Sequence, residues 1–232
     1  MKNKKPTILF LDIETTPNLA YVWGKYQQDV IEFDKETQIL SISWKEQGSS
    51  NVRFVRYPSP ELLCRLLNRA DIVVAHNGKA FDLKHIHREI LQGGLKPPSP
   101  YSIVDTLTVA RKHFKFNSNK LGDLGKSLKI GTKVQTGGFK LWLDCLAGKS
   151  KAWDKMERYN KQDVVLLEKV YDKLLPWIDN HPSIALLKGR KGCANCGSRK
   201  LHSKGYRVTT KTRYQRFQCQ DCGAPSQVVK GI

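Results

Sequence analysis

The chain has 232 residues, 40% of them hydrophobic, and Lys and Arg outnumber Asp and Glu by 40 to 21. This length and apolar fraction exclude wholesale disorder and predict one domain of ordinary size plus a small appendage. The net charge of +19 favours polyanions, so nucleic acid is the expected partner. No stretch approaches the roughly 18 consecutive apolar residues of a membrane span, and Asp12 cuts the first apolar run too early for a secretory signal. We therefore expect a soluble, cytoplasmic protein without membrane contact.

The chain begins with strand patterns and continues with alternating helices and strands. Residues 7–13 form a nearly continuous apolar run, and residues 38–44 and 52–57 alternate as in an antiparallel meander. Apolar spacing and turn residues then predict helices at 60–70, 81–94, 105–114, 120–129 and 141–148 and strands at 71–77 and 102–106. A long helix is expected from Ala152 to Leu175, where Pro176 closes it.

This order of elements predicts an α/β fold, a mixed sheet flanked by helices. Residues 181–191, between the long helix and the cysteine-rich end, are interpreted as a linker. The expected organisation is therefore a main domain at 1–180, the linker, and a small module at 192–232.

The first strand carries two acids two residues apart. On an extended strand Asp12 and Glu14 point to the same face, while Leu9, Leu11 and Ile13 fill the other. Two carboxylates so close raise each other's pKa unless a cation lies between them. A strand running into a polar turn is the simpler interpretation of an isolated pair of this kind.

Further acids follow later strands. Asp82 is expected in the first turn of a helix, where the helix dipole explains an acid equally well. Asp105 has the same strand-to-helix placement and is interpreted as an N-cap. Asn77 and its neighbour His76 either contact a substrate or close the turn between strand and helix.

One acid of the long helix lies on the wrong face. Helical spacing places Asp163 on an apolar stripe formed by Met156, Tyr159, Leu166, Leu167 and Val170. A carboxylate on a core-facing stripe costs several kcal/mol, in rough terms, unless something binds it. Tyr159 is one turn away from Asp163, and it is either a core aromatic or a functional hydroxyl.

Taken together, these segments resemble the signature motifs of the DEDD, or DnaQ-like, exonucleases. Asp12 and Glu14 match the first motif, Asp82 in "NGKAFD" the second, and Tyr159 with Asp163 the third. The resemblance covers residues 7 to about 178 and implies a ribonuclease H-like fold and 3′-to-5′ exonuclease activity. A tyrosine four residues before the last acid, with Arg158 where the other branch has histidine, is similar to the tyrosine (DEDDy) branch and to small phage-encoded exonucleases within it.

The resemblance also implies two catalytic ions. Four convergent acids suit Mg²⁺ or Mn²⁺, which prefer oxygen ligands. Asp12 is expected to bridge both ions, Glu14 and Asp163 to complete the first site, and Asp82 to support the second. Tyr159 is expected to orient the attacking water.

The cysteines near the end of the chain have metal-ligand spacing. Cys193 and Cys196 form one C-x-x-C knuckle, Cys219 and Cys222 another, with 22 residues between the knuckles. Such spacing predicts one structural Zn²⁺ held by four thiolates, in a zinc ribbon similar to those of some transposases. Cys64 and Cys145 stand alone in apolar contexts and are expected to be inert.

The predicted ribbon is strongly basic. Residues 183–232 contain eleven Lys or Arg and one acid, so they carry +10 of the net charge. Cations interleaved with aromatic rings are typical of surfaces that hold phosphates and stack on bases. The candidate substrate contacts there are Tyr206, Arg207, Arg213, Tyr214, Arg216 and Phe217. A zinc-stapled module that binds a protein is the alternative.

These patterns favour an exonuclease acting on DNA. An RNA-trimming enzyme of the same branch is one alternative, and a regulatory protein whose nuclease domain is only a docking platform is another. The presence of all four acids and the tyrosine favours the enzyme. A polymerase, or another replication or repair protein, is a further candidate partner.

Overall fold

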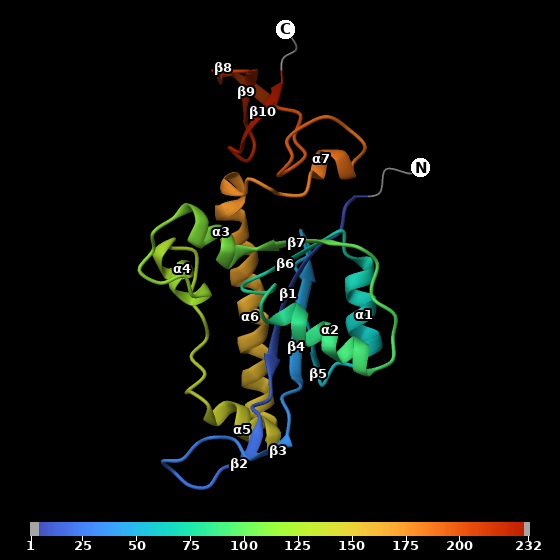
Figure 1. Ribbon diagram of the computed structural model, residues 1–232, viewed down its shortest axis with the longest axis vertical. Helices are drawn as coiled ribbons and strands as arrows, with labels where there is room; N and C mark the ends of the chain where they lie inside the picture. The colour runs from blue at the N-terminus through green and yellow to red at the C-terminus, as the bar shows by residue number, and fades with distance from the viewer. Residues whose placement is uncertain (1–4, 230–232) are drawn as a thin grey trace.

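A computed structural model describes residues 5–229, and its centre is a five-stranded mixed sheet (Figure 1). The strand order is β5-β4-β1-β6-β7, and the strands are β1 Ile8–Thr15, β4 Ile39–Glu46, β5 Arg53–Arg56, β6 Ile72–Ala75 and β7 Ser102–Asp105. β1 pairs with β4 and β4 with β5 antiparallel, whereas β1–β6 and β6–β7 are parallel. The predicted meander and mixed α/β sheet are therefore confirmed.

Helices cover both faces of the sheet. α1 (Pro60–Arg69) and α2 (Asp82–Gln92) pack on the face that receives Leu9, Leu11 and Ile13. The other face receives Phe10 and Val74 and packs against α3 (Thr106–His113), α4 (Leu121–Ser127) and α6 (Ser150–Leu174). β6 is buried throughout, as expected for a parallel strand between two helical layers. Each face therefore has its own apolar core.

α6 is the long helix predicted from the apolar stripe. It runs the length of the sheet (Figure 1), and Pro176 lies in the short 3₁₀ helix η1 (Leu175–Trp177) that follows. Its Met156 packs in a third core cluster with α5 (Lys140–Leu146) and Leu40. Packing against the sheet, α5 and the α3–α4 pair thus fixes the rotation of α6 about its own axis.

Two pairings were missed by the sequence patterns. A hairpin of β2 (Leu19–Tyr21) and β3 (Glu32–Lys35) follows β1, and β10 (Pro225–Val229) is the last strand. β3 and most of β2 are exposed, so no buried face imposes the alternation that would have revealed them. β10 is likewise exposed along most of its length.

The C-terminal module is a second sheet of order β10-β9-β8, with β8 at Leu201–Val208 and β9 at Arg213–Cys219. The two predicted ribbon strands are therefore present. The segment interpreted as a linker contains a short helix, α7 (Ile184–Leu187), whose Ile184 belongs to the core beneath α6. The outer ends of the predicted domains, residues 1–4 and 230–232, lie outside the described residues.

The module is anchored at the C-terminal end of α6. The Asn195 side-chain nitrogen donates hydrogen bonds to the carbonyl oxygens of Leu175 (2.6 Å) and Ile178 (3.1 Å). The buried Tyr171 hydroxyl lies 2.7 Å from Nε2 of His181. These contacts therefore fix the position of the ribbon relative to α6. Within residues 5–229, no helix combines the length and apolar character needed to cross a membrane.

Candidate active site and metal centres

The carboxyl end of β1 carries the first two candidate acids. Leu9, Leu11 and Ile13 pack under α1 and α2, so the alternation of the strand turns Asp12 and Glu14 toward α6. A register irregularity between Glu14 and Thr15 ends the regular pairing with β4. The strand thus delivers two neighbouring carboxylates to the rim of the sheet.

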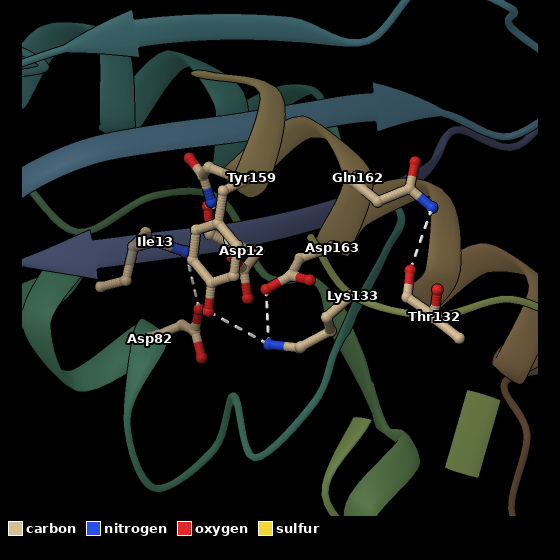
Figure 2. A network of polar contacts seen from close by, with 9 residues as sticks. Asp12, Ile13, Asp82, Thr132, Lys133, Tyr159, Gln162 and Asp163 are labelled. Atoms are coloured by element: carbon tan, nitrogen blue, oxygen red, sulfur yellow. Dashed lines mark hydrogen bonds and ion pairs between the residues drawn. The ribbon is translucent and has the colours of Figure 1, made fainter. Parts of the chain in front are cut away.

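Asp163 of α6 completes a compact acidic cluster with these two residues. Carboxylate oxygens of Asp12, Glu14 and Asp163 lie within 4.8 Å of one another, and Asp163 is fully buried. Figure 2 shows Asp163 projecting from α6 toward Asp12 on β1. The acid that seemed misplaced on an apolar stripe therefore faces two other acids from the opposite end of the chain.

Asp82 stands beside this cluster but is not one of the three. It is the first residue of α2 and is buried, and its Oδ1 accepts a hydrogen bond from the backbone N–H of Ile13 at 3.1 Å. Its helix therefore starts against the end of β1, which fixes the carboxylate next to Asp12 (Figure 2).

The electrostatics of the four acids favour a bound cation. Burial, followed by the carboxylates of Asp163, Glu14 and Asp82, raises the pKa of Asp12 well above its usual range. Burial and then Asp163 raise the pKa of Glu14 to about 8, and burial raises the pKa of Asp82 to about 7. Metal ions offset such repulsion directly.

Lys133 is a cation in this cluster that the sequence patterns did not single out. Its ammonium lies 2.5 Å from Oδ2 of Asp163 and 3.3 Å from the Tyr159 hydroxyl (Figure 2). Oδ1 of Asp163 has no hydrogen-bond partner among the described residues, although it is buried. A buried, unpaired carboxylate oxygen in a residue that clusters with two other carboxylates fits a divalent ion with oxygen ligands.

Asn160 is a second residue that was missed. Its side-chain nitrogen donates to both the carbonyl oxygen (3.2 Å) and Oδ2 (2.6 Å) of Asp12, and its Oδ1 accepts from Ser41 at 3.3 Å. Asn160 and Ser41 are both fully buried. A signal was available, because Asn160 is another polar residue on the apolar stripe of α6.

Tyr159 lies beside the acids. Burial, followed by the carboxylates of Glu14 and Asp163, raises its pKa, so the hydroxyl keeps its proton at neutral pH. Its ring meets Trp142 edge-on at a centroid distance of 6.1 Å. The tyrosine therefore has both a packing partner and a hydroxyl directed at the cluster.

A hollow of about 780 Å³ opens beside Asp12, and cations outnumber acids in its lining. Asp12 and Tyr159 line it, together with Lys133 and three exposed cations of α3, α4 and their connection, Arg111, Lys120 and Lys126. We call this hollow the catalytic cleft. None of the three exposed cations had been predicted as a substrate contact. On short helices, no spacing pattern in the sequence distinguishes a cation that faces a cleft from any other surface cation.

His76 and Asn77 line the catalytic cleft and also hold its wall. Nε2 of His76 donates to the Asn119 carbonyl at 2.9 Å. The backbone N–H of Asn77, a residue with φ 67°, donates to Asp105 at 3.0 Å. Asp105 also accepts from Leu107, as predicted for an N-cap. Both alternatives for His76 and Asn77, turn closure and substrate contact, are compatible with these positions.

The four clustered cysteines converge on one point. Cys193 and Cys222 have their sulfur atoms 3.6 Å apart, as do Cys196 and Cys219, and ligand atoms of all four lie within 4.8 Å. A tetrahedral zinc site with Zn–S bonds of about 2.3 Å separates its sulfur atoms by about 3.8 Å. The thiolates therefore fit a Zn²⁺ ion, and Cys64 and Cys145 lie elsewhere as free thiols.

The candidate contacts of the ribbon do not form one surface. Arg207, Arg216 and Phe217 line a groove between the ribbon and the end of α6. The guanidinium carbon of Arg213 instead lies 3.7 Å from the centre of the Tyr206 ring. Neither of these two residues nor Tyr214 lines that groove.

Comparison with known proteins agrees with this architecture. One relative, the DNA polymerase III PolC-type of Ureaplasma parvum serovar 3 (strain ATCC 700970), is 41% identical over 59 residues, which are 25% of this chain and 4% of that protein. The similarity thus spans a small part of a much longer protein. The sequence profile of the RNase H superfamily matches residues 9–175, which contain all four acids and Tyr159. The chain therefore belongs to the RNase H superfamily.

Proposed function

We propose that the protein is a two-metal-ion exonuclease that hydrolyses nucleic acid from a free 3′ end, with DNA as the favoured substrate. The observation that carries this proposal is the cluster of Asp12, Glu14 and Asp163, whose carboxylate oxygens lie within 4.8 Å of one another. Asp163 has in addition a buried Oδ1 without a hydrogen-bond partner among the described residues, and Asp12 lines a cleft with exposed cations on its wall. The branch assignment and the direction of attack rest on the resemblance of the three motifs.

The division of roles follows from position. Asp12, Glu14 and Asp163 would hold Mg²⁺ or Mn²⁺, and Asp82 would support a second ion. Two such ions supply Lewis-acid stabilisation of the charge that develops on a phosphate and lower the pKa of a water molecule. The protonated hydroxyl of Tyr159 orients the attacking water. Lys133 places positive charge at the same point, and Asn160 fixes the carboxylate of Asp12.

The cleft accounts for substrate binding. Arg111, Lys120 and Lys126 are exposed along its wall and attract the phosphates on the 5′ side of the scissile bond. The volume of about 780 Å³ is large enough for terminal nucleotides. DNA is favoured over RNA because the relative is named as a DNA polymerase and the ribbon is similar to transposase ribbons.

We also propose that the four clustered cysteines hold one structural Zn²⁺ and that the ribbon binds nucleic acid. Soft thiolates select zinc, whereas the carboxylate cluster selects hard cations, so the two sites discriminate between metals. Burial raises the pKa of Cys196 to about 11. Burial also acts to raise the pKa of Cys219, but hydrogen bonds from the backbone N–H groups of Cys222 and Asp221 and from the neighbouring thiols together lower it to about 7, which favours its thiolate.

The test is a cleavage assay with Mg²⁺ or Mn²⁺ on end-labelled, single- and double-stranded DNA and RNA whose 3′ ends are free or blocked. Stepwise shortening from free 3′ ends, abolished by EDTA, is expected. The Asp163→Asn variant keeps the shape of the site and removes one charge, so it is the matched control and is expected to be less active than the unchanged protein. Preference for RNA would select the RNA-trimming alternative. Activity of the control variant at the level of the unchanged protein would contradict the two-metal proposal.

A further inference from the structure

The groove at the foot of the ribbon is a second basic hollow. It has a volume of about 870 Å³, and Lys204, Arg207 and Arg216 line it on the ribbon side, opposite Ile178 and Asp179 at the end of α6. We call it the ribbon groove. Among the described residues none of these three cations forms an ion pair: Arg207 donates to the side-chain oxygen of Gln227 at 3.4 Å, and Arg216 donates to the Lys204 carbonyl oxygen at 2.8 Å. Their charge is therefore available to an anionic ligand.

The ribbon groove and the catalytic cleft lie on either side of the end of α3. Arg111 of α3 lines the catalytic cleft, and the next residue, Lys112, forms an ion pair of 2.7 Å with Asp179 in the ribbon groove. His113 also lies 3.3 Å from Asp179. Among the described residues that line the ribbon groove, Asp179 is the one acid, and it is thus already paired by α3. Where a strand would pass from one hollow to the other, the end of α3 therefore places a cation beside the carboxylate of Asp179.

The two hollows have a fixed spacing because α6 connects them. From Asp163 in the cluster to Leu174, the last residue of the helix, the rise is about 17 Å. Asn195 and Ile184 fix the ribbon beyond that end. A stacked strand advances about 3.4 Å per nucleotide, so about five nucleotides cover this length.

From this arrangement we infer that one strand of nucleic acid occupies both hollows: its 3′ end lies in the catalytic cleft, and its 5′ portion passes the end of α3 into the ribbon groove. This inference rests on the proposed function and adds a minimum substrate length to it. A strand shorter than about five nucleotides reaches only the cleft, whereas a longer strand also gains the ribbon cations. The half-buried Phe217 ring in the groove offers a stacking surface for a base.

A length series tests the inference. Single strands of 4, 8 and 16 nucleotides, as DNA and as RNA, are compared by kcat/KM in Mg²⁺ and by fluorescence anisotropy in EDTA. The unchanged protein is expected to favour 16 nucleotides over 4 by at least tenfold in both measurements. Arg207→Gln with Arg216→Gln should remove most of this preference, leave the 4-nucleotide values within twofold, and lower the salt slope of 16-nucleotide binding by about 1.4, for two phosphate contacts on a single strand.

The matched control is Arg199→Gln with Lys211→Gln, which removes the same charge from exposed ribbon positions that do not line the groove. Zinc content and thermal melting of each variant confirm folding. Equal losses in the two double variants would mean a diffuse charge effect and would overturn the inference. Equal cleavage and binding of 4 and 16 nucleotides by the unchanged protein would also overturn it while leaving the nuclease proposal intact. If nothing is cleaved, the proposed function fails, and the anisotropy series still decides whether the groove binds a strand.

Discussion

The carboxylate cluster and the thiolate cluster are built in opposite ways. Asp12 and Asp163 are 151 residues apart, and a buried sheet and a 25-residue helix bring them together. The four thiols lie within residues 193–222, and the cluster packed around them contains only Cys193, Cys219 and Ala224 as buried members. The fold itself therefore holds the carboxylates against their repulsion, whereas the ribbon has so small a core that we expect it to depend on the proposed Zn²⁺. Changes in the carboxylate cluster should therefore mainly lower nuclease activity, whereas changes in the cysteine cluster should mainly lower stability.

The largest effect is expected for Asp12→Asn. This change removes the negative charge that we propose holds the ions and keeps an oxygen that can accept from Asn160. Nuclease activity should fall at least about a thousandfold, since both proposed ions lose a ligand. Because the folded-state pKa of Asp12 is raised, its ionisation costs folding free energy as pH rises above the unfolded pKa. The melting temperature in EDTA at pH 8 should therefore stay equal or rise. A large drop would show that Asp12 is structural.

The next effect concerns Asn160, which positions Asp12 and does not touch the proposed ions. Asn160→Ala should weaken Mn²⁺ binding about 10- to 100-fold, the usual range for residues that orient a metal ligand. Calorimetric titration of Mn²⁺ without substrate measures this directly. Ser41→Ala, which removes only a 3.3 Å contact to Asn160, is the control and should change affinity severalfold at most. Unchanged Mn²⁺ affinity in Asn160→Ala would assign Asn160 to folding alone.

Asn160 also marks the limit of prediction from sequence. The strands and the long helix followed from periodicities, because a period of two or 3.6 fixes which face a residue takes. The convergence of Asp12, Glu14 and Asp163 followed from the resemblance of their motifs to a known family. The partners of the acids did not follow. Lys133 comes from a segment without periodicity, and the contact of Asn160 with Asp12 depends on how α6 crosses β1. The β2–β3 hairpin was missed because it buries so little.

A third prediction uses the raised pKa values of the cluster. In the metal-free protein, Glu14 with a pKa of about 8 and Asp82 with a pKa of about 7 hold protons at pH 6. Ion binding needs the ionised carboxylates and releases these protons, so Mn²⁺ affinity should rise with pH up to about 8 and then level off. The expected slope is about tenfold per pH unit for each proton released. Calorimetry in buffers of different ionisation enthalpy counts the protons, and an affinity that is constant from pH 6 to 8 would contradict the predicted coupling.

Substitutions in the cysteine cluster should have the smallest effect on nuclease activity and a clear effect on the melting temperature. Cys193→Ser with Cys222→Ser should abolish the binding of one zinc per chain, measured by elemental analysis. The melting temperature should fall, because Cys196 and Cys222 pack against the core beneath α6 and Asn195 bonds to the carbonyls that follow that helix. Cys64→Ser, in a different part of the fold, is the control and should change neither quantity.

At temperatures below its melting temperature, the same double variant should cleave a 4-nucleotide strand at a rate no more than about fivefold lower than that of the unchanged protein. The reason is the distance along α6. The Asn195 side chain of the ribbon bonds to carbonyl oxygens just beyond the end of this helix, and Asp163 lies about 17 Å and three turns before that end. Loss of zinc should therefore loosen the end of the helix and leave the carboxylates in place. Complete loss of 4-nucleotide cleavage in a variant that still melts cooperatively would show that the two clusters form one cooperative unit, and that the metal of the ribbon holds the catalytic helix.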